Sequence, residues 1–326
     1  MASRNDTRPS RERTRNDSRE LSLKARRVVT PEGVAGPSTV EVRDGHIALV
    51  RPAHGPVPDV TLVPGFVDLQ VNGLGSVHCA TAVDDEWTSI GRQLAASGVT
   101  TWLPTVTTRA IDEYSDILKR IAAMALSSVD TGHILPEIAG VHLEGPFLGE
   151  RPGAHPGHLI VDTSHNFIDN LHPIVRLMTL GAEAEGAVEA TRSLVDRGVR
   201  VAIGHTAASD ERLDSVIRAG ASLVTHLFNA MSGVHHRESG VASWALTTDA
   251  VSVSVIGDLH HVSARALEIA LRCKPRSRLI AVSDSVAHRR RGLVDGGGGR
   301  PARTIDGTLA GSTIGMDGCY RSLLKA

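Results

Sequence analysis

The feature that most constrains this chain is a repeated rhythm of short apolar runs, each followed by a polar loop and then by a helical pattern. The runs are rich in Val, Ile and Leu, as the buried strands of a parallel sheet are. We expect strands at about residues 62–69, 100–103, 138–143, 174–179, 199–203, 221–225, 251–256 and 279–282.

Patterns with apolar residues about every 3.6 positions lie between many of these runs. We expect helices at residues 84–97, 110–127, 184–197, 209–219 and 263–272, with Asp84, Ser209 and Ser263 as three of the starting residues. Eight strands with helical crossovers predict an α/β fold, a parallel (β/α)8 barrel of the TIM type. A doubly wound open sheet has a similar rhythm. The count of eight favours the barrel, as does the lack of a Gly-rich dinucleotide fingerprint after the first strand.

The chain divides into three regions. Residues 1–20 carry six Arg among polar residues, which is typical of a disordered tail, with an interaction arm as the alternative. Residues 21–60 hold short β-like runs separated by Gly and Pro turns, so we expect part of a small β-sandwich-like domain there. Residues 61–326 are expected to form the barrel. The chain stops at Ala326, within the pattern of the last barrel helix, so we expect a barrel that is incomplete at its C-terminal end.

Charge and cysteine content exclude several classes of protein. The net charge is −1 and the pI is near 7.0, so nothing indicates a nucleic-acid or membrane partner. No apolar run approaches the roughly 20 residues that span a bilayer, and the N-terminus lacks the apolar segment of a secretory signal. Cys79, Cys273 and Cys319 are widely spaced and form no CxxC pattern, so we expect free thiols in a cytoplasmic protein.

Several of the expected strands end in a residue that can bind a metal or carry a proton. Glu144 closes the third strand, His205 the fifth, His226 the sixth and Asp284 the eighth. In a β/α barrel these ends meet at one mouth. Further polar residues end the first strand (Asp68, Gln70 and Asn72) and the seventh (His260 or His261).

One carboxylate and two imidazoles suit a divalent ion such as zinc and leave a position for water. Bound zinc lowers the pKa of its water to about 7, which makes hydroxide available at neutral pH. We expect one ion, with Zn²⁺ as the first choice and Fe²⁺ and Mn²⁺ as alternatives, bound by Glu144, His205 and His226. Asp284 is placed to take the proton of the water and deliver it to a leaving group.

The sequence also resembles a known family, the N-acetylglucosamine-6-phosphate deacetylases of the amidohydrolase superfamily of metal-dependent hydrolases. The resemblance runs from about Leu62 to the C-terminus. HLEGPF and THLFNAM together are highly specific, whereas PGFVD marks only the superfamily. The residues that carry the resemblance are Pro64–Gly73, His142–Phe147, Gly153–His155, Gly204–Thr206, Thr225–Met231, Arg237-Glu238, Ser283-Asp284 and Gly307–Ser312.

The resemblance implies a role for each matching position. Glu144, His205 and His226 match the metal ligands, and Asp284 matches the catalytic acid and base. The sugar and phosphate would be held by Ala154, His155, Asn229, Ala230, Arg237, His261, Leu309, Ala310 and Gly311. The implied reaction is hydrolysis of the acetamide of N-acetylglucosamine 6-phosphate to glucosamine 6-phosphate and acetate, a step of amino sugar catabolism or cell-wall recycling. A homodimer is also implied.

Departures from the pattern leave alternatives open. Gln70 and Asn72 stand where many amidohydrolases have the His-x-His of a second metal, so we expect a single ion. The choice between His260 and His261 stays open, although spacing favours His261. Residues 289–303 are expected to be a mobile segment beside the mouth, with a solvated insertion as the alternative. The rival functions are an amidohydrolase for another N-acyl amino sugar or N-acyl amino acid, and a truncated non-catalytic homologue.

Overall fold

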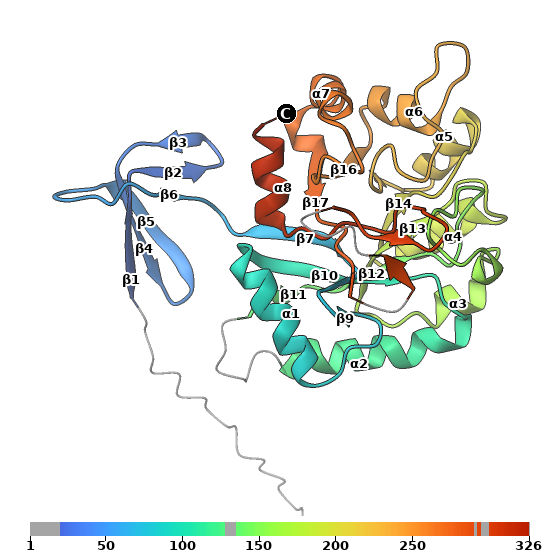
Figure 1. Ribbon diagram of the computed structural model, residues 1–326, viewed down its shortest axis with the longest axis horizontal. Coiled ribbons are helices and arrows are strands. Elements are labelled where there is room, and N and C mark those ends of the chain that lie inside the picture. Colours follow the sequence, from blue (N-terminus) through green and yellow to red (C-terminus); the bar gives the residue numbers. More distant parts are fainter. Residues whose placement is uncertain (1–19, 128–134, 290–291, 295–299, 326) are drawn as a thin grey trace, which may run out of the picture. The chain divides into compact units, whose positions relative to one another are not determined.

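The structure, a computed structural model, describes residues 20–127, 135–289, 292–294 and 300–325 (Figure 1). The expected disordered tail, apart from Glu20, therefore lies outside the described residues. Two compact units divide between Pro64 and Gly65. The boundaries expected at residues 20 and 60 stay predictions.

The N-terminal unit contains two small sheets. Strands β1 (Leu21–Ala25), β4 (Ser38–Arg43) and β5 (His46–Pro52) form an antiparallel sheet in the order β1-β4-β5. Strand β2 (Arg27–Thr30) pairs with β3 (Gly33–Ala35) and with β6 (Thr61–Leu62). The core of this unit is small, since from Glu20 to Pro64 its buried apolar cluster consists of Ala25, Val28 and Val40.

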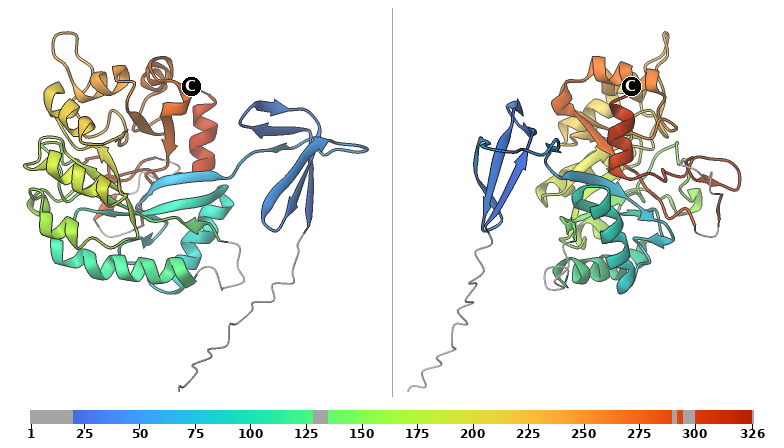
Figure 2. Two further views of the ribbon diagram at one scale, coloured as in Figure 1. Left: turned by 180° about the vertical axis from the view of Figure 1, so that it is seen from behind. Right: turned by 60° about the vertical axis from the view of Figure 1, so that its left-hand side comes forward.

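The second unit is built around eight parallel strands, as the rhythm of the sequence predicts, and Figures 1 and 2 show the helices packed outside them. Strand β7 pairs with β10, and the order then runs β10-β12-β13-β14-β15-β16-β17. The short β11 (Glu137–Ile138) adds to β10. The barrel strands are β7 (Phe66–Val71), β10 (Val99–Thr107), β12 (Val141–Glu144), β13 (Val175–Leu180), β14 (Arg200–Ile203), β15 (Leu223–Val224), β16 (Ser252–Ile256) and β17 (Leu279–Val282).

All five expected helices are present. They are α1 (Asp85–Ala96), α2 (Tyr114–Ser127), α4 (Ala187–Asp196), α5 (Asp210–Arg218) and α7 (Ala264–Cys273). Three more helices are α3 (His165–Asp169), α6 (Val241–Thr247) and α8 (Met316–Leu323). Of the expected starting residues, Ser263 caps α7 by accepting a hydrogen bond from the Ala266 N–H, whereas Asp84 and Ser209 make no such bond. None of the described helices is long and apolar enough to cross a membrane.

The first and last strands of the ring, β7 and β17, are joined differently from the other adjacent strands. Within the described chain, no strand pairing joins β7 to β17. Their C-terminal ends are held instead by a single bridge between Val71 and Ser285, whose carbonyl accepts the N–H groups of Asn72 and Gly73 at 2.8 and 3.1 Å. The buried Asp68 carboxylate accepts the Ser283 N–H at 3.2 Å. We call this contact between the first and last barrel strands the seam.

Candidate metal centre

Three of the predicted site residues share one backbone arrangement. His205, His226 and Asp284 each lie two residues beyond the end of their strand, β14, β15 and β17 respectively. Their φ angles are 51°, 32° and 46°, in the left-handed region that residues other than glycine rarely adopt. Such strained conformations persist only where the surroundings determine them, and they cluster at functional sites.

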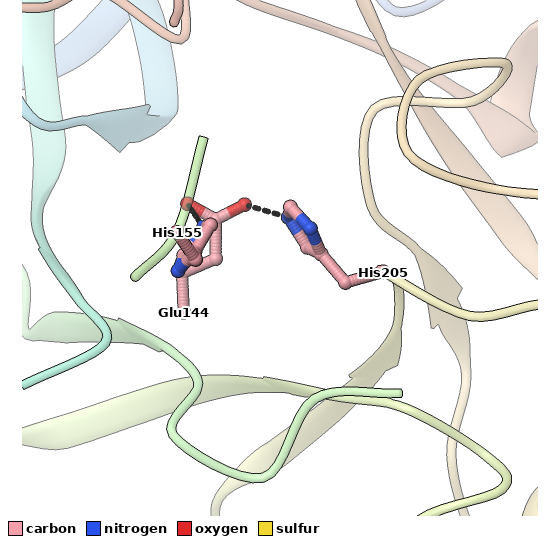
Figure 3. Close-up of side chains that lie close together, drawn as sticks. All are labelled: Glu144, His155 and His205. Carbon is pink, nitrogen blue, oxygen red and sulfur yellow. Dashed lines mark hydrogen bonds and ion pairs between the residues drawn. The ribbon is translucent and has the colours of Figure 1, made fainter. Parts of the chain in front are cut away.

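The predicted ligands converge on one point at the mouth of the barrel. Glu144 Oε1 lies 2.9 Å from His226 Nε2 and 3.1 Å from His205 Nε2, and the two Nε2 atoms are 3.1 Å apart. All three residues are at most 4% exposed. Figure 3 shows Glu144 with His205 and with a further histidine, His155, facing the same carboxylate.

This donor set fits a divalent ion. Ligand atoms at 2.0–2.1 Å from a tetrahedral zinc lie about 3.3 Å from one another, close to the separations found here. His205 donates its Nδ1 proton to the carbonyl of Arg151 at 3.1 Å, which leaves the Nε2 lone pair for an ion. The residues present therefore fit one ion, with Glu144 as its anionic ligand.

His155 was predicted as a sugar contact, and the structure places it within the cluster of ligand atoms. Its Nε2 lies 3.7 Å from Glu144 Oε2, and its Nδ1 bonds to Thr108 Oγ1 at 2.8 Å. Glu144, His155 and His205 each offer one ligand atom, all within 4.8 Å of one another. A fourth metal ligand and a substrate contact are therefore both compatible with its position.

Burial and mutual contacts set the charges of the cluster. Burial alone would raise the pKa of Glu144, but the neighbouring imidazoles of His155, His205 and His226 hold it well below its usual range. Burial, aided by the neighbouring His155, lowers the pKa of His205 to about 4. Glu144 is thus ionised and His205 neutral, which are the forms that bind metals.

Asp284 lies beside these ligands but has the opposite tendency. Burial, and then the charge of Glu144, raise its pKa to about 7. Asn72 Nδ2 donates a hydrogen bond to Asp284 Oδ1 at 2.8 Å, which favours the ionised form. A carboxyl group with a pKa near neutrality can both accept and return a proton, as a general acid–base requires.

These residues line a cavity of about 550 Å³, within the usual range for a small-molecule site. Arg237 and His260 do not line it, and both are exposed. Among the described residues of its wall there is no Lys or Arg. The predicted residues in the wall are Glu144, Ala154, His155, His205, His226, Asn229, Ala230, His261, Asp284, Leu309, Ala310 and Gly311.

His261 enters the cavity wall with a fixed orientation. Its Nδ1 donates to Asp258 Oδ2 at 2.7 Å, and its buried Nε2 has no partner among the described residues. Asp258 also accepts the backbone N–H groups of His260 and His261. Burial would raise the pKa of Asp258, but the bonds from His261 outweigh it and lower the pKa.

Sequence reasoning missed a hydrogen-bond partner of Glu144 and one histidine of the cavity wall. Gln70 Nε2 donates to Glu144 Oε1 at 3.0 Å, so the residue in place of a metal-binding histidine holds the carboxylate instead. His78, which no pattern singled out, lines the cavity. His142, two residues before Glu144, is buried and bonds to the Leu69 carbonyl and to Thr179 Oγ1.

The segment at residues 289–303 is only partly within the described chain. Residues 290–291 and 295–299 lie outside it, so the expectation of a mobile segment stays a prediction. Gly292 and Leu293 line the cavity. Strand β18 (Leu293–Val294) pairs with β19 (Arg303–Thr304), so the two ends of the segment are joined beside the mouth.

Comparison with known proteins agrees with this geometry. No family model matches the chain. The chain is 31% identical to the N-acetylgalactosamine-6-phosphate deacetylase of Escherichia coli O157:H7, covering 93% of the chain and 83% of the relative. It is 32% identical to the N-acetylglucosamine-6-phosphate deacetylase of Bacillus subtilis (strain 168), covering 91% and 80%.

Solved structures show the same likeness. The N-acetyl-D-glucosamine-6-phosphate deacetylase of Mycobacterium smegmatis, a mutant in complex with N-acetyl-D-glucosamine-6-phosphate, superposes with a TM-score of 0.82 at 29% identity, covering 93% of this chain and 83% of that one. The Thermotoga maritima N-acetylglucosamine-6-phosphate deacetylase gives 0.84 at 26% identity, covering 94% and 84%.

The barrel, with a carboxylate and imidazoles gathered at its strand ends, is that of the amidohydrolase superfamily of metal-dependent hydrolases. Within that class, the identity to curated relatives over most of their length is decisive. The chain belongs to the N-acetylglucosamine-6-phosphate deacetylase family.

Proposed function

We propose that this chain hydrolyses the acetamide of N-acetylglucosamine 6-phosphate to give glucosamine 6-phosphate and acetate, as a hydrolase of a linear amide. The observation that carries the proposal is the convergence of Glu144, His205 and His226 within 3.1 Å of one another, in the same cavity as Asp284. The relatives named for this activity support it.

The residues divide the chemistry between them. Glu144, His205 and His226 would hold one divalent ion, with Zn²⁺ as our first choice. When bound, such an ion polarises a carbonyl oxygen and lowers the pKa of water. Asp284 takes a proton from the attacking water and passes it to the amine nitrogen as the C–N bond breaks, so that acetate and a free amine leave.

The remaining predicted residues would bind the sugar phosphate. His261 offers the cavity a buried Nε2 in an orientation fixed by Asp258. Ala154, Ala230 and residues 309–311 supply backbone and small side chains to the wall. Arg237 stays a predicted phosphate contact, although it lies outside the wall.

Metal analysis of the purified protein, followed by a deacetylation assay, tests the proposal. We expect close to one ion per chain and release of acetate from N-acetylglucosamine 6-phosphate. The same assay on N-acetylglucosamine without phosphate should give a much lower kcat/KM. A protein that binds the ion but turns over neither compound would refute the proposed reaction.

N-acetylgalactosamine 6-phosphate is a second candidate substrate. The Escherichia coli O157:H7 relative, whose name specifies that sugar, is as similar to this chain as the glucosamine relatives are. The two sugars differ only at the C4 hydroxyl, so parallel measurements of kcat/KM on both would decide between them.

We further propose that the chain works in the cytoplasm as a homodimer. Its three cysteines are all free, as suits a reducing compartment. Sedimentation analysis of the purified protein and fractionation of the source cells test the two parts separately.

A further inference from the structure

Glu183 lies outside the cavity wall, and its carboxylate bonds to the two loops that carry ligands on either side of it, after β12 and β14. It follows β13 and is partly buried. Its Oε1 accepts the backbone N–H groups of Glu150 and Ala207, both at 2.9 Å, and its Oε2 accepts the hydroxyl of Thr206. Glu150 belongs to the loop after β12, and the other two residues to the loop after β14. One carboxylate therefore ties together the loops of three neighbouring strands.

The chain makes room for this carboxylate with glycine. A Cβ atom on Gly149 would lie 2.1 Å from Glu183 Oε1, closer than any real contact. A Cβ atom on Gly181 would lie 2.2 Å from the backbone nitrogen of Gly149. A larger residue at Gly149 would displace the Glu183 carboxylate, whereas one at Gly181 would push the backbone of the two loops apart.

The loop after β12 contacts His205 at both its backbone and its side chain. The Gly149 N–H donates to the carbonyl of His205 at 2.9 Å. The Arg151 carbonyl accepts the Nδ1 proton of the same residue at 3.1 Å. Thr206, which directly follows the strained His205 backbone, is bonded to Glu183. The position and the tautomer of His205 thus both depend on the loops that Glu183 connects.

We propose that Glu183 is a positioning residue of the metal centre, which fixes His205 in the orientation that binds the ion. The inference rests on the metal-dependent function proposed above. Bonds from two backbone N–H groups and a hydroxyl to an ionised carboxylate are stronger than neutral ones. Loss of such an outer partner weakens metal binding by about 10–100-fold in other metal sites.

The test compares Glu183→Ala with Glu183→Gln and with the control Glu185→Ala, which removes an exposed carboxylate from the same loop. Zn²⁺ affinity is measured by competition with a chelator, and the geometry of the site by the absorption spectrum of bound Co²⁺. We expect the Zn²⁺ dissociation constant of Glu183→Ala to rise by about 10–100-fold. Glu183→Gln keeps an oxygen for the two N–H groups but loses the charge and the second oxygen, so its affinity should lie between those of the wild type and Glu183→Ala. The control should match the wild type.

A merely structural role would lower the melting temperature of the metal-free protein without changing Zn²⁺ affinity or the Co²⁺ spectrum. That outcome for a folded Glu183→Ala overturns the inference. Should this variant fail to fold, Thr206→Val removes one of the three hydrogen bonds of Glu183, together with the bond that the Thr206 hydroxyl accepts from the Ala208 N–H. It should still weaken Zn²⁺ binding severalfold, and an unchanged affinity would then count against the inference. A wild-type protein that binds Zn²⁺ but has no deacetylase activity overturns the proposed function alone.

Discussion

Replacing Asn72 with alanine is expected to shift the acid limb of the pH–activity profile to higher pH. As the pH is lowered, the variant should lose activity before the wild type does. Asn72 Nδ2 donates to Asp284 Oδ1 at 2.8 Å in a buried place, and this bond favours the ionised carboxylate. A hydrogen bond to a charged group contributes about 1.5–3 kcal/mol. Since about 1.4 kcal/mol corresponds to one pKa unit, loss of the bond should raise the pKa of Asp284 by about one to two units.

The direction follows from the role of Asp284 as the initial proton acceptor. Only the ionised carboxylate can take a proton, so kcat/KM falls as the pH drops through the pKa of Asp284. A bound cation lowers that pKa below the value of about 7 found for the protein alone, and does so in both proteins. The difference between wild type and variant is therefore the quantity to measure.

The assay is kcat/KM as a function of pH, from about pH 5 to 9, with the metal content determined for both proteins. We expect the acid limb of Asn72→Ala to lie about one to two pH units higher, with a similar plateau in alkaline solution. Coincident acid limbs at equal metal content would refute both the role of the hydrogen bond and the assignment of Asp284 as the titrating base.

Four further changes have definite expected outcomes. Asp284→Asn should reduce kcat by about 10²–10⁴-fold while metal analysis still finds one ion, and full activity would exclude Asp284 as the acid–base. Glu144→Gln should empty the site, so a variant that retains stoichiometric metal contradicts its role as the anionic ligand. A chelator should abolish activity and lower the melting temperature, because an ion at a thousandfold excess over its Kd stabilises the native state by about 4 kcal/mol. Burial raises the pKa of Asp68 from 3.8 to about 6. The contribution of Asp68 to stability is thus present below about pH 4 and lost as the pH rises through about 6. The unfolding free energy of wild type minus that of Asp68→Asn should therefore fall by about 2 kcal/mol between pH 4 and 7. A constant difference would contradict the burial argument.

The order of strands and helices could be predicted because it depends on local patterns. Five helices and all eight barrel strands lie where the apolar runs indicate. The bounds were less accurate. The second barrel strand, β10, continues to Thr107, beyond the predicted end at Leu103, although Pro104 has no N–H to donate. A shift in the pairing of β10 with β7 between Trp102 and Pro104 accommodates the missing donor.

Contacts of the site between residues on different strands could not be predicted in this way. The bonds Gln70–Glu144 and Asn72–Asp284 join residues 74 and 212 positions apart in the chain. A sequence pattern can place a polar residue at a strand end, but its partner depends on which strand lies opposite. Glu183 was missed for a related reason, since it bonds to backbone groups of two other loops rather than to a ligand.

The seam between β7 and β17 has a consequence for how the enzyme is assembled. Asp284 follows the last barrel strand and its partner Asn72 follows the first, so we expect the two to meet only when the ring of strands has closed. We expect a partly folded chain in which β12 to β15 have paired to bring Glu144, His205 and His226 together, while Asp284 is not yet in place. Such a chain would capture metal without hydrolysing substrate. Metal uptake should therefore precede activity during refolding, and the delay between them would measure the time that the ring takes to close.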